Sequence, residues 1–128
     1  MTYGNVVFLG CGDVGPLHEP VDAFGTLVRP VFATADLRFA QCERMCTDKG
    51  ALMPHGSPTG RIKPHMDSLY DYCGFNVVSV AGNHAMDWGG EALLDAMARL
   101  RQKGIHVMGG GRNIEEARKP AIVEKNGV

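Results

Sequence analysis

The chain has 128 residues, of which 45% are hydrophobic and 21% charged, and its formal net charge is −1 at pH 7. This length fits one domain, and the balanced charge argues against a general nucleic-acid binder, which would carry a basic stripe. No apolar run approaches the roughly 18–20 residues of a membrane span, and the N-terminus lacks a signal-peptide pattern. We therefore expect a cytoplasmic protein with no membrane partner.

The first third of the chain contains two predicted strands, each followed by a carboxylate. The apolar run within residues 5–10 is typical of a buried strand, and Asp13 follows it in a glycine-rich turn. Residues 37–42 form a weaker strand that ends directly before Glu43. Alternative roles remain for both carboxylates, because Asp is common in turns and a lone Glu is most often solvated.

The segment 44–64 is rich in glycine and proline and is long for a structureless connection. Loops of this length are lids, binding loops or mobile segments. Its basic residues suit an anionic substrate, although solvation is the commoner role of charged loop residues. Lys49, Arg61 and Lys63 are among these basic residues.

The four cysteines form no CxxC pair, so we expect reduced and mostly buried thiols. A zinc site built from Cys42 and Cys46 would need two further ligands at matching spacing, and the sequence contains none.

Residues 76–88, with the sequence NVVSVAGNHAMDW, carry the densest group of candidate ligands. The β-branched run predicts a buried strand, which turns at a glycine into Asn83, His84 and Asp87. Open α/β sheets hold their sites on loops that follow such strands. The alternative is a tight turn in which Asn83 and Asp87 cap the next helix.

The remaining segments alternate between helical and strand-like patterns. Apolar spacing predicts four helices, at residues 21–34, 66–73, 90–103 and 113–118, and Pro30 is expected to end or kink the first. Residues 105–108 and 121–125 are predicted strands. The dipeptide Asn126-Gly127 is a strong hairpin signal with only Val128 after it, so we infer a missing C-terminal part or a strand supplied by a partner.

Alternation of strands and helices predicts a mainly parallel α/β sheet that is flanked by helices on both faces. The carboxyl ends of parallel strands lie along one edge, so we expect Asp13, Glu43 and the Asn83-His84 pair to meet there. These donors suit a divalent metal such as Mn, Fe or Zn, and two ions would polarise a phosphoryl or carbonyl group. We take His84 and Asp87 as the candidate catalytic residues.

Several motifs resemble the N-terminal part of the bacterial capsule-synthesis CapA (poly-γ-glutamate) family, which is similar in fold to calcineurin-like metallophosphoesterases. The most specific match is the run GNHAMDWG at residues 82–89, and the resemblance covers nearly the whole chain. The other matching pieces are GDV at 12–14, ADL at 35–37, QCE at 41–43, GFNVVS at 74–79, GGGRN at 109–113 and EARKPA at 116–121.

The resemblance implies a four-layer α/β/β/α fold, of which residues 1–128 form a single incomplete domain. It implies metal contacts from Asp13, Glu43 and Asn83, with His84 as a further ligand or as an acid for the leaving group. Two departures stand out: Gly15 occupies a place where the enzymes usually carry a His, and Gln41 a place where this family usually has Asn.

Three functions follow as hypotheses. The first is a metal-dependent hydrolase that acts on a phosphoester or an amide of a small anionic or peptide-like substrate. The second is a non-catalytic subunit of a poly-γ-glutamate synthesis assembly, in which a homo-oligomer partner or the missing C-terminal part completes the site. The third is a nucleotide-binding module that uses residues 109–111, although this glycine run lacks the Lys-Ser/Thr of a P-loop.

Overall fold

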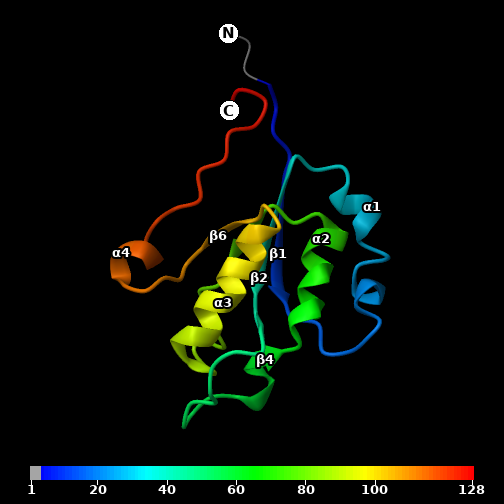
Figure 1. Ribbon diagram of the computed structural model, residues 1–128. Coiled ribbons are helices and arrows are strands. Elements are labelled where there is room, and N and C mark those ends of the chain that lie inside the picture. The colour runs from blue at the N-terminus through cyan, green and yellow to red at the C-terminus, as the bar shows by residue number, and fades with distance from the viewer. Residues whose placement is uncertain (1–3) are drawn as a thin grey trace.

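A four-stranded parallel sheet forms the centre of the protein, whose computed structural model describes residues 4–128 (Figure 1). All three neighbouring strand pairs are parallel, which confirms the α/β class predicted from the alternating pattern. The spatial order is β1-β2-β5-β6. The strands are β1 (Phe8–Val14), β2 (Leu37–Cys42), β5 (Val77–Ser79) and β6 (His106–Met108).

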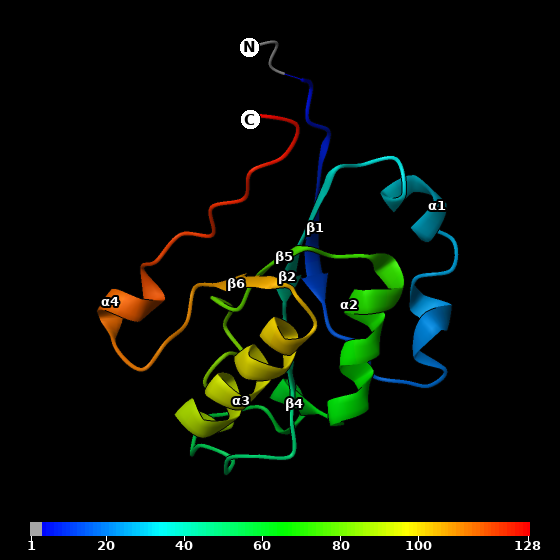
Figure 2. The same ribbon diagram turned by 45° about the horizontal axis from the view of Figure 1, so that its top comes forward.

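Helices α2 (Ser68–Cys73) and α3 (Gly89–Gln102) cover the same face of this sheet, as the two views in Figures 1 and 2 agree. The expectation of helices on both faces is therefore wrong for the described residues. The strand order follows the chain order without a reversal, and right-handed crossovers then place every connecting helix on one side. This one-sided layer is consistent with the N-terminal part of a metallophosphoesterase-like domain.

The core lies between the sheet and these two helices. Val78 and Val80 are fully buried there, together with Met97 of α3. Side chains alternate along a strand, so Phe39 points to the opposite face from its buried neighbour Ala40. On that opposite face, the ring of Phe39 lies 6.4 Å from the ring of Phe8, which is 57% exposed.

The first predicted helix is two short ones, η1 (Val21–Phe24) and α1 (Arg29–Phe32). Pro30 stands in the first turn of α1, where its missing N–H leaves no helical hydrogen bond unmade, so it begins a helix and does not end one. The ends of the later helices agree with the predictions from sequence. Gly74 and Gly104 follow α2 and α3 with φ of 70° and 78°, and the Asn113 side chain caps α4 (Ile114–Ala117).

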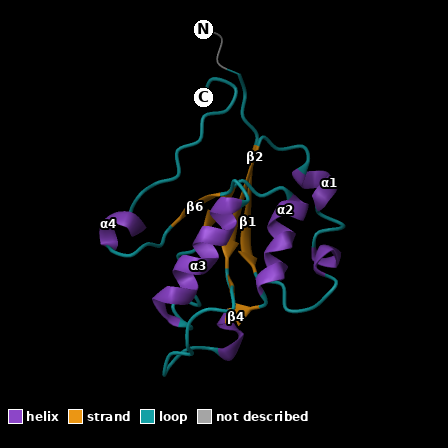
Figure 3. Cartoon of the chain, in the orientation of Figure 1, coloured by secondary structure: helices purple, strands orange, loops and turns teal. Residues whose placement is uncertain are grey.

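The long segment 44–64 contains two short strands, which Figure 3 distinguishes from the loops. Strand β3 (Met45–Cys46) pairs in parallel with β4 (Arg61–Ile62). Nη1 of Arg61 donates to the backbone carbonyl of Lys49 at 2.9 Å, and the guanidinium lies 3.5 Å from the ring centroid of Trp88. Arg61 therefore fastens this segment to the turn that precedes α3.

The predicted strand at residues 121–125 is wrong, because this described segment is extended but pairs with no other strand. The hairpin signal after it does form a turn. Asn126 and Gly127 adopt φ of 53° and 77°, and Lys125 and Val128 exchange two backbone hydrogen bonds of 2.9 Å. Instead of joining the sheet, the turn contacts the N-terminal segment through a hydrogen bond from Gly4 N to Asn126 O.

Among residues 4–128, no helix combines the length and the apolar composition that crossing a membrane requires.

A buried ion-pair cluster joins the start of α2 to the end of α3. The Asp67 carboxylate, 3% exposed, accepts a hydrogen bond from Arg99 Nη2 at 2.7 Å and lies 3.3 Å from Lys103 Nζ. Lys103 also pairs with Asp71, whose side chain is 46% exposed. The two aspartates therefore share a partner but differ in burial.

We expect Asp67→Ala to lower the free energy of unfolding by about 2–3 kcal/mol, because the partly exposed Arg99 and Lys103 lose the buried carboxylate that they share. Asp71→Ala is the matched control and should cost less than about 1 kcal/mol, as is usual for an exposed pair. Urea denaturation followed by circular dichroism measures both. Equal losses for the two variants would contradict the structural role given to Asp67.

Candidate metal centre

Parallel pairing brings the ends of the first three strands of the sheet together. Asp13 is in register with Gln41, which is in register with Ser79. Glu43 directly follows β2, and its backbone N–H donates to the carbonyl of Val14 at 3.1 Å. One prediction was wrong in detail: Asp13 lies inside β1 and not beyond its end, because the strand continues through the glycines to Val14 with an irregular register between Gly10 and Asp13.

His84 faces Glu43 from the turn that follows β5. Its Nε2 lies 4.0 Å from Glu43 Oε1, and its Nδ1 lies 2.6 Å from Asp87 Oδ2. The three side chains are 12–23% exposed, so each is partly withdrawn from solvent. Asp87 does not cap α3, whose N-cap is Trp88 without a side-chain hydrogen bond. The arrangement is a line of three groups, Asp87–His84–Glu43, at the carboxyl edge of the sheet.

Residues 53–60, which precede β4, pack against Asp87. The backbone N–H of Met53 donates to the Asp87 carbonyl at 2.8 Å. A Cβ at Gly60 would lie 2.3 Å from Asp87 Oδ2, and one at Gly56 would lie 2.3 Å from Asp87 O, so neither position has room for a side chain. Sequence reasoning missed this packing, for which the two glycines were the available signal.

Asp13 and Glu43 line the same pocket, which has a volume of about 280 Å³. Most of its wall is apolar and includes Phe24, Phe32 and Leu69. Asn83 is exposed on the turn beside His84, and in the described part of the chain no hydrogen bond joins it to Asp13, Glu43 or His84. The structure thus brings Glu43 together with His84 and, across a pocket, with Asp13.

Glu43 and His84 are close enough to contact one ion, although their separation is longer than that of neighbouring ligands in a tetrahedral site. Two donors that each lie about 2.0–2.2 Å from an ion are separated by at most about 4.4 Å. The observed separation of 4.0 Å falls just inside this limit. Within residues 4–128, however, no group of three or more His, Cys, Asp and Glu side chains is arranged to hold a metal, so further donors would be needed.

Arg44 is a residue at this site that the sequence analysis did not single out. Its Nη2 lies 3.2 Å from Glu43 Oε1, and its Nη1 donates to the Thr59 carbonyl at 2.6 Å. The signal was a basic residue directly after the candidate ligand Glu43, within a segment where we treated charged side chains as solvated.

Burial disfavours the alternative zinc site at Cys42 and Cys46. Both thiols are buried and approach the carbonyl of Arg44, at 3.3 Å and 3.9 Å. Burial raises the pKa of the Cys42 thiol to about 11 and that of Cys46 well above its usual value. Because the thiolate is the form that binds metal, burial works against a zinc site here.

The glycine run at residues 109–111 is explained by close packing. A Cβ at Gly110 would lie 2.8 Å from Val80 Cγ2, and one at Gly111 would lie 2.3 Å from Glu116 Cβ. These glycines let the segment after β6 approach the core and α4.

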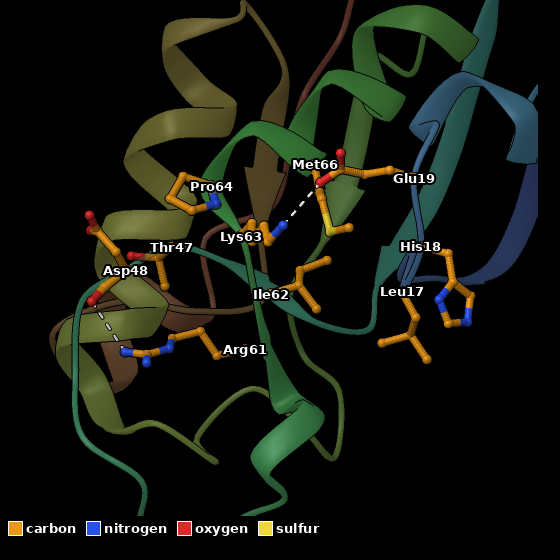
Figure 4. A pocket seen from close by; sticks show the side chains of 10 residues that line it. All are labelled: Leu17, His18, Glu19, Thr47, Asp48, Arg61, Ile62, Lys63, Pro64 and Met66. Atoms are coloured by element: carbon orange, nitrogen blue, oxygen red, sulfur yellow. Dashed lines mark hydrogen bonds and ion pairs between the residues drawn. The ribbon is translucent and has the colours of Figure 1, made fainter.

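A larger pocket of about 650 Å³ lies beside β4 (Figure 4). Three of its charged groups have protein partners: Glu19 Oε1 lies 3.2 Å from Lys63 Nζ and 2.9 Å from His65 Nε2, and Arg61 binds backbone carbonyls. The hydrogen bonds of Arg61 indicate a structural role, whereas Lys63 makes only an exposed ion pair.

The model of the family described as "Bacterial capsule synthesis protein PGA_cap" matches residues 8–128. The chain belongs to the PGA_cap family.

One PGA_cap relative is the "PGA biosynthesis protein CapA" of Bacillus subtilis (strain 168). It is 33% identical over 55 residues, which cover 42% of this chain and 14% of the relative. The aligned part is therefore a small share of the relative's length. Family membership confirms the resemblance that residues 82–89 and the other motifs indicated.

The burial of the thiols can be tested by labelling the native PGA_cap chain with a thiol-specific disulfide reagent at pH 8. We expect about one thiol per chain to react, because of the four only Cys11 is partly exposed, and to react more slowly than a fully exposed thiol, because burial raises the pKa of Cys11. Mass mapping identifies the labelled residue, and unfolding in urea exposes the other three as a control. Rapid native labelling of Cys42 or Cys46 would contradict the burial described here.

Proposed function

We propose that this PGA_cap protein is a metal-dependent hydrolase that acts in capsule synthesis on a phosphoester or an amide bond. The observation that carries the proposal is the line Asp87–His84–Glu43, in which a partly buried carboxylate orients an imidazole toward a second carboxylate. Such a line serves both metal binding and proton transfer, because the carboxylate on one ring nitrogen sets the tautomer and frees the other nitrogen.

In this proposal Asp87 accepts a hydrogen bond from the N–H at His84 Nδ1, which leaves Nε2 without a proton on the side of Glu43. Nε2 then serves either as a metal ligand or as a base that takes a proton from the attacking water and afterwards gives it to the leaving oxygen or nitrogen. A bound divalent cation such as Mn, Fe or Zn would supply Lewis acidity toward a phosphoryl or carbonyl oxygen. Asp87 is a positioning residue in both cases.

Asp13 and Asn83 are the proposed further oxygen donors. Asp13 shares its pocket with Glu43, and Asn83 is adjacent in sequence to His84, so both are candidates for a second ion or for completing the first shell. Carboxylate, amide and imidazole donors together fit a borderline or hard divalent metal better than a soft one.

The substrate proposed is a small anionic or peptide-like molecule. The family description and the name of the Bacillus relative both concern capsule or PGA synthesis, which favours a peptide-like amide. A non-catalytic subunit of a poly-γ-glutamate synthesis assembly is the second candidate. It is favoured by the ion pair of Arg44 with Glu43, which neutralises the carboxylate that a metal would use.

We expect the protein to bind Mn²⁺, and Glu43→Gln to weaken this binding by at least about tenfold because it removes a charged ligand. Asp87→Asn should cost about 10–100-fold, as is usual for a partner that orients a ligand. Titration calorimetry measures both, with Glu19→Gln, an exposed carboxylate elsewhere, as a control that keeps wild-type affinity. Absence of Mn²⁺ binding by the wild-type protein would refute the metal centre.

A turnover screen with phosphoesters and γ-glutamyl amides in the presence of Mn²⁺ distinguishes the hydrolase from the non-catalytic subunit. The hydrolase proposal predicts turnover that is lost in Glu43→Gln and His84→Ala. Mn²⁺ binding without turnover of any substrate would favour the non-catalytic subunit.

A further inference from the structure

The pocket that Asp13 and Glu43 line has an aromatic wall. Three phenylalanines contribute to this wall, and the rings of Phe32 and Phe75 lie 5.3 Å apart, tilted by 54°. The third is Phe24 of η1, a segment that packs against α2. A volume of about 280 Å³ is just below the roughly 300–1,000 Å³ of sites for drug-sized ligands. The pocket therefore suits the apolar body of a small molecule.

Part of the apolar wall faces solvent. Phe24 is 50% exposed and Val28 is 42% exposed, although both line the pocket. Leu69 and Phe75 on the inner side are buried. A ligand in the pocket would cover the exposed parts of Phe24 and Val28, and burial of apolar surface favours binding.

The charge at this pocket is negative. Asp13 and Glu43 line it, whereas no lysine, arginine or histidine does. Glu43 is already compensated by Arg44, whose Nη2 lies 3.2 Å from Glu43 Oε1. Asp13 is exposed and takes part in none of the ion pairs within residues 4–128. One carboxylate at the pocket thus has no cation as its partner.

Two thiols complete the wall without adding charge. Cys11 of β1 and Cys73 of α2 both line the pocket. Burial raises the pKa of both thiols above the ordinary value, so both are neutral at pH 7. The pocket therefore combines an apolar, aromatic wall with a single uncompensated negative charge.

We propose that this pocket binds a small primary ammonium ion with an apolar body, whose charge pairs with Asp13 and whose body packs against the phenylalanine rings. A carboxylate accepts strong charge-assisted hydrogen bonds from an ammonium group, and the faces of aromatic rings attract cations. A neutral ligand of the same shape lacks both attractions, and an anionic one is repelled by Asp13. The inference goes beyond the proposed hydrolase and needs no metal.

The test is titration calorimetry at pH 7 with EDTA present, so that no divalent ion competes for Asp13. Phenethylamine is the probe, and phenethyl alcohol and hydrocinnamate are its neutral and anionic counterparts. We expect the amine to bind at least about tenfold more tightly than the alcohol, and hydrocinnamate to bind most weakly. This margin is the usual value of a hydrogen bond between charged groups.

Asp13→Asn should lower the affinity for phenethylamine at least about tenfold and leave that for phenethyl alcohol unchanged, because only the charge is lost. Glu19→Gln, at an exposed carboxylate outside this pocket, is the control and should keep wild-type affinities. If Asp13→Asn does not fold by circular dichroism, the salt dependence of the wild-type protein replaces it. Added NaCl should then weaken the amine and not the alcohol.

Phe24→Ala tests the apolar wall. It should weaken both the amine and the alcohol at least about threefold, because it removes apolar contact area that both ligands use. Leu27→Ala is the matched control, since Leu27 is 89% exposed on the same segment but does not line the pocket. It should leave both affinities unchanged.

An amine preference that Asp13→Asn removes, together with weaker binding in Phe24→Ala, supports the proposal. No saturable binding of phenethylamine, equal binding of amine and alcohol by the wild-type protein, or unchanged amine affinity in Asp13→Asn overturns it. L-Phenylalaninamide distinguishes two sources of the ammonium: tighter binding than phenethylamine indicates the amino end of a peptide-like ligand, and weaker binding a free amine. None of these results depends on Mn²⁺, so the metal centre stands or falls by its own titration.

Discussion

Parallel pairing of β2 with β1 on one side and with β5 on the other is the constraint on which the site depends. Asp13, Gln41 and Ser79 lie in register, so the carboxyl ends of β1, β2 and β5 lie at the same edge of the sheet. Residues that are about forty positions apart in sequence, Glu43 and His84, thereby come within 4.0 Å. The connecting helices pack on one face of the sheet only, because the strands lie in chain order and each crossover is right-handed.

The turn after β5 is held from two directions, and this fixes the imidazole. On one side, the 2.6 Å contact between His84 Nδ1 and Asp87 Oδ2 orients the imidazole ring. On the other side, Gly56 and Gly60 of the segment before β4 pack against Asp87. The guanidinium of Arg61, which stacks on the ring of Trp88, holds this segment in place. A precisely held ligand set needs such support, since a side chain left free to rotate loses the geometry that metal binding requires.

Sequence reasoning identified the parts of the fold that are decided locally. The apolar strands around Ala40 and Val78, helix α3 and the glycine ends of α2 and α3 follow from periodicity and from the left-handed conformation that glycine permits. Partnering was harder to predict. Residues 121–125 have strand propensity but no partner, whereas β3 and β4 are only two residues long and are recognisable only as a pair.

The candidate site divides in the same way. That Glu43 and His84 would meet follows from parallel topology, which the alternating pattern predicts. That Asp87 would bind His84 and not cap α3, and that Arg44 would occupy the space beside Gly15, depend on how the segment 44–64 folds back, and no local pattern encodes that path.

The most direct measurement of the central claim is anomalous X-ray diffraction from crystals of this PGA_cap protein soaked in Mn²⁺. The account predicts a peak within about 2.4 Å of both a Glu43 carboxylate oxygen and His84 Nε2. A fully soaked crystal with no peak between these two side chains, or with its strongest peak at another surface, would contradict it.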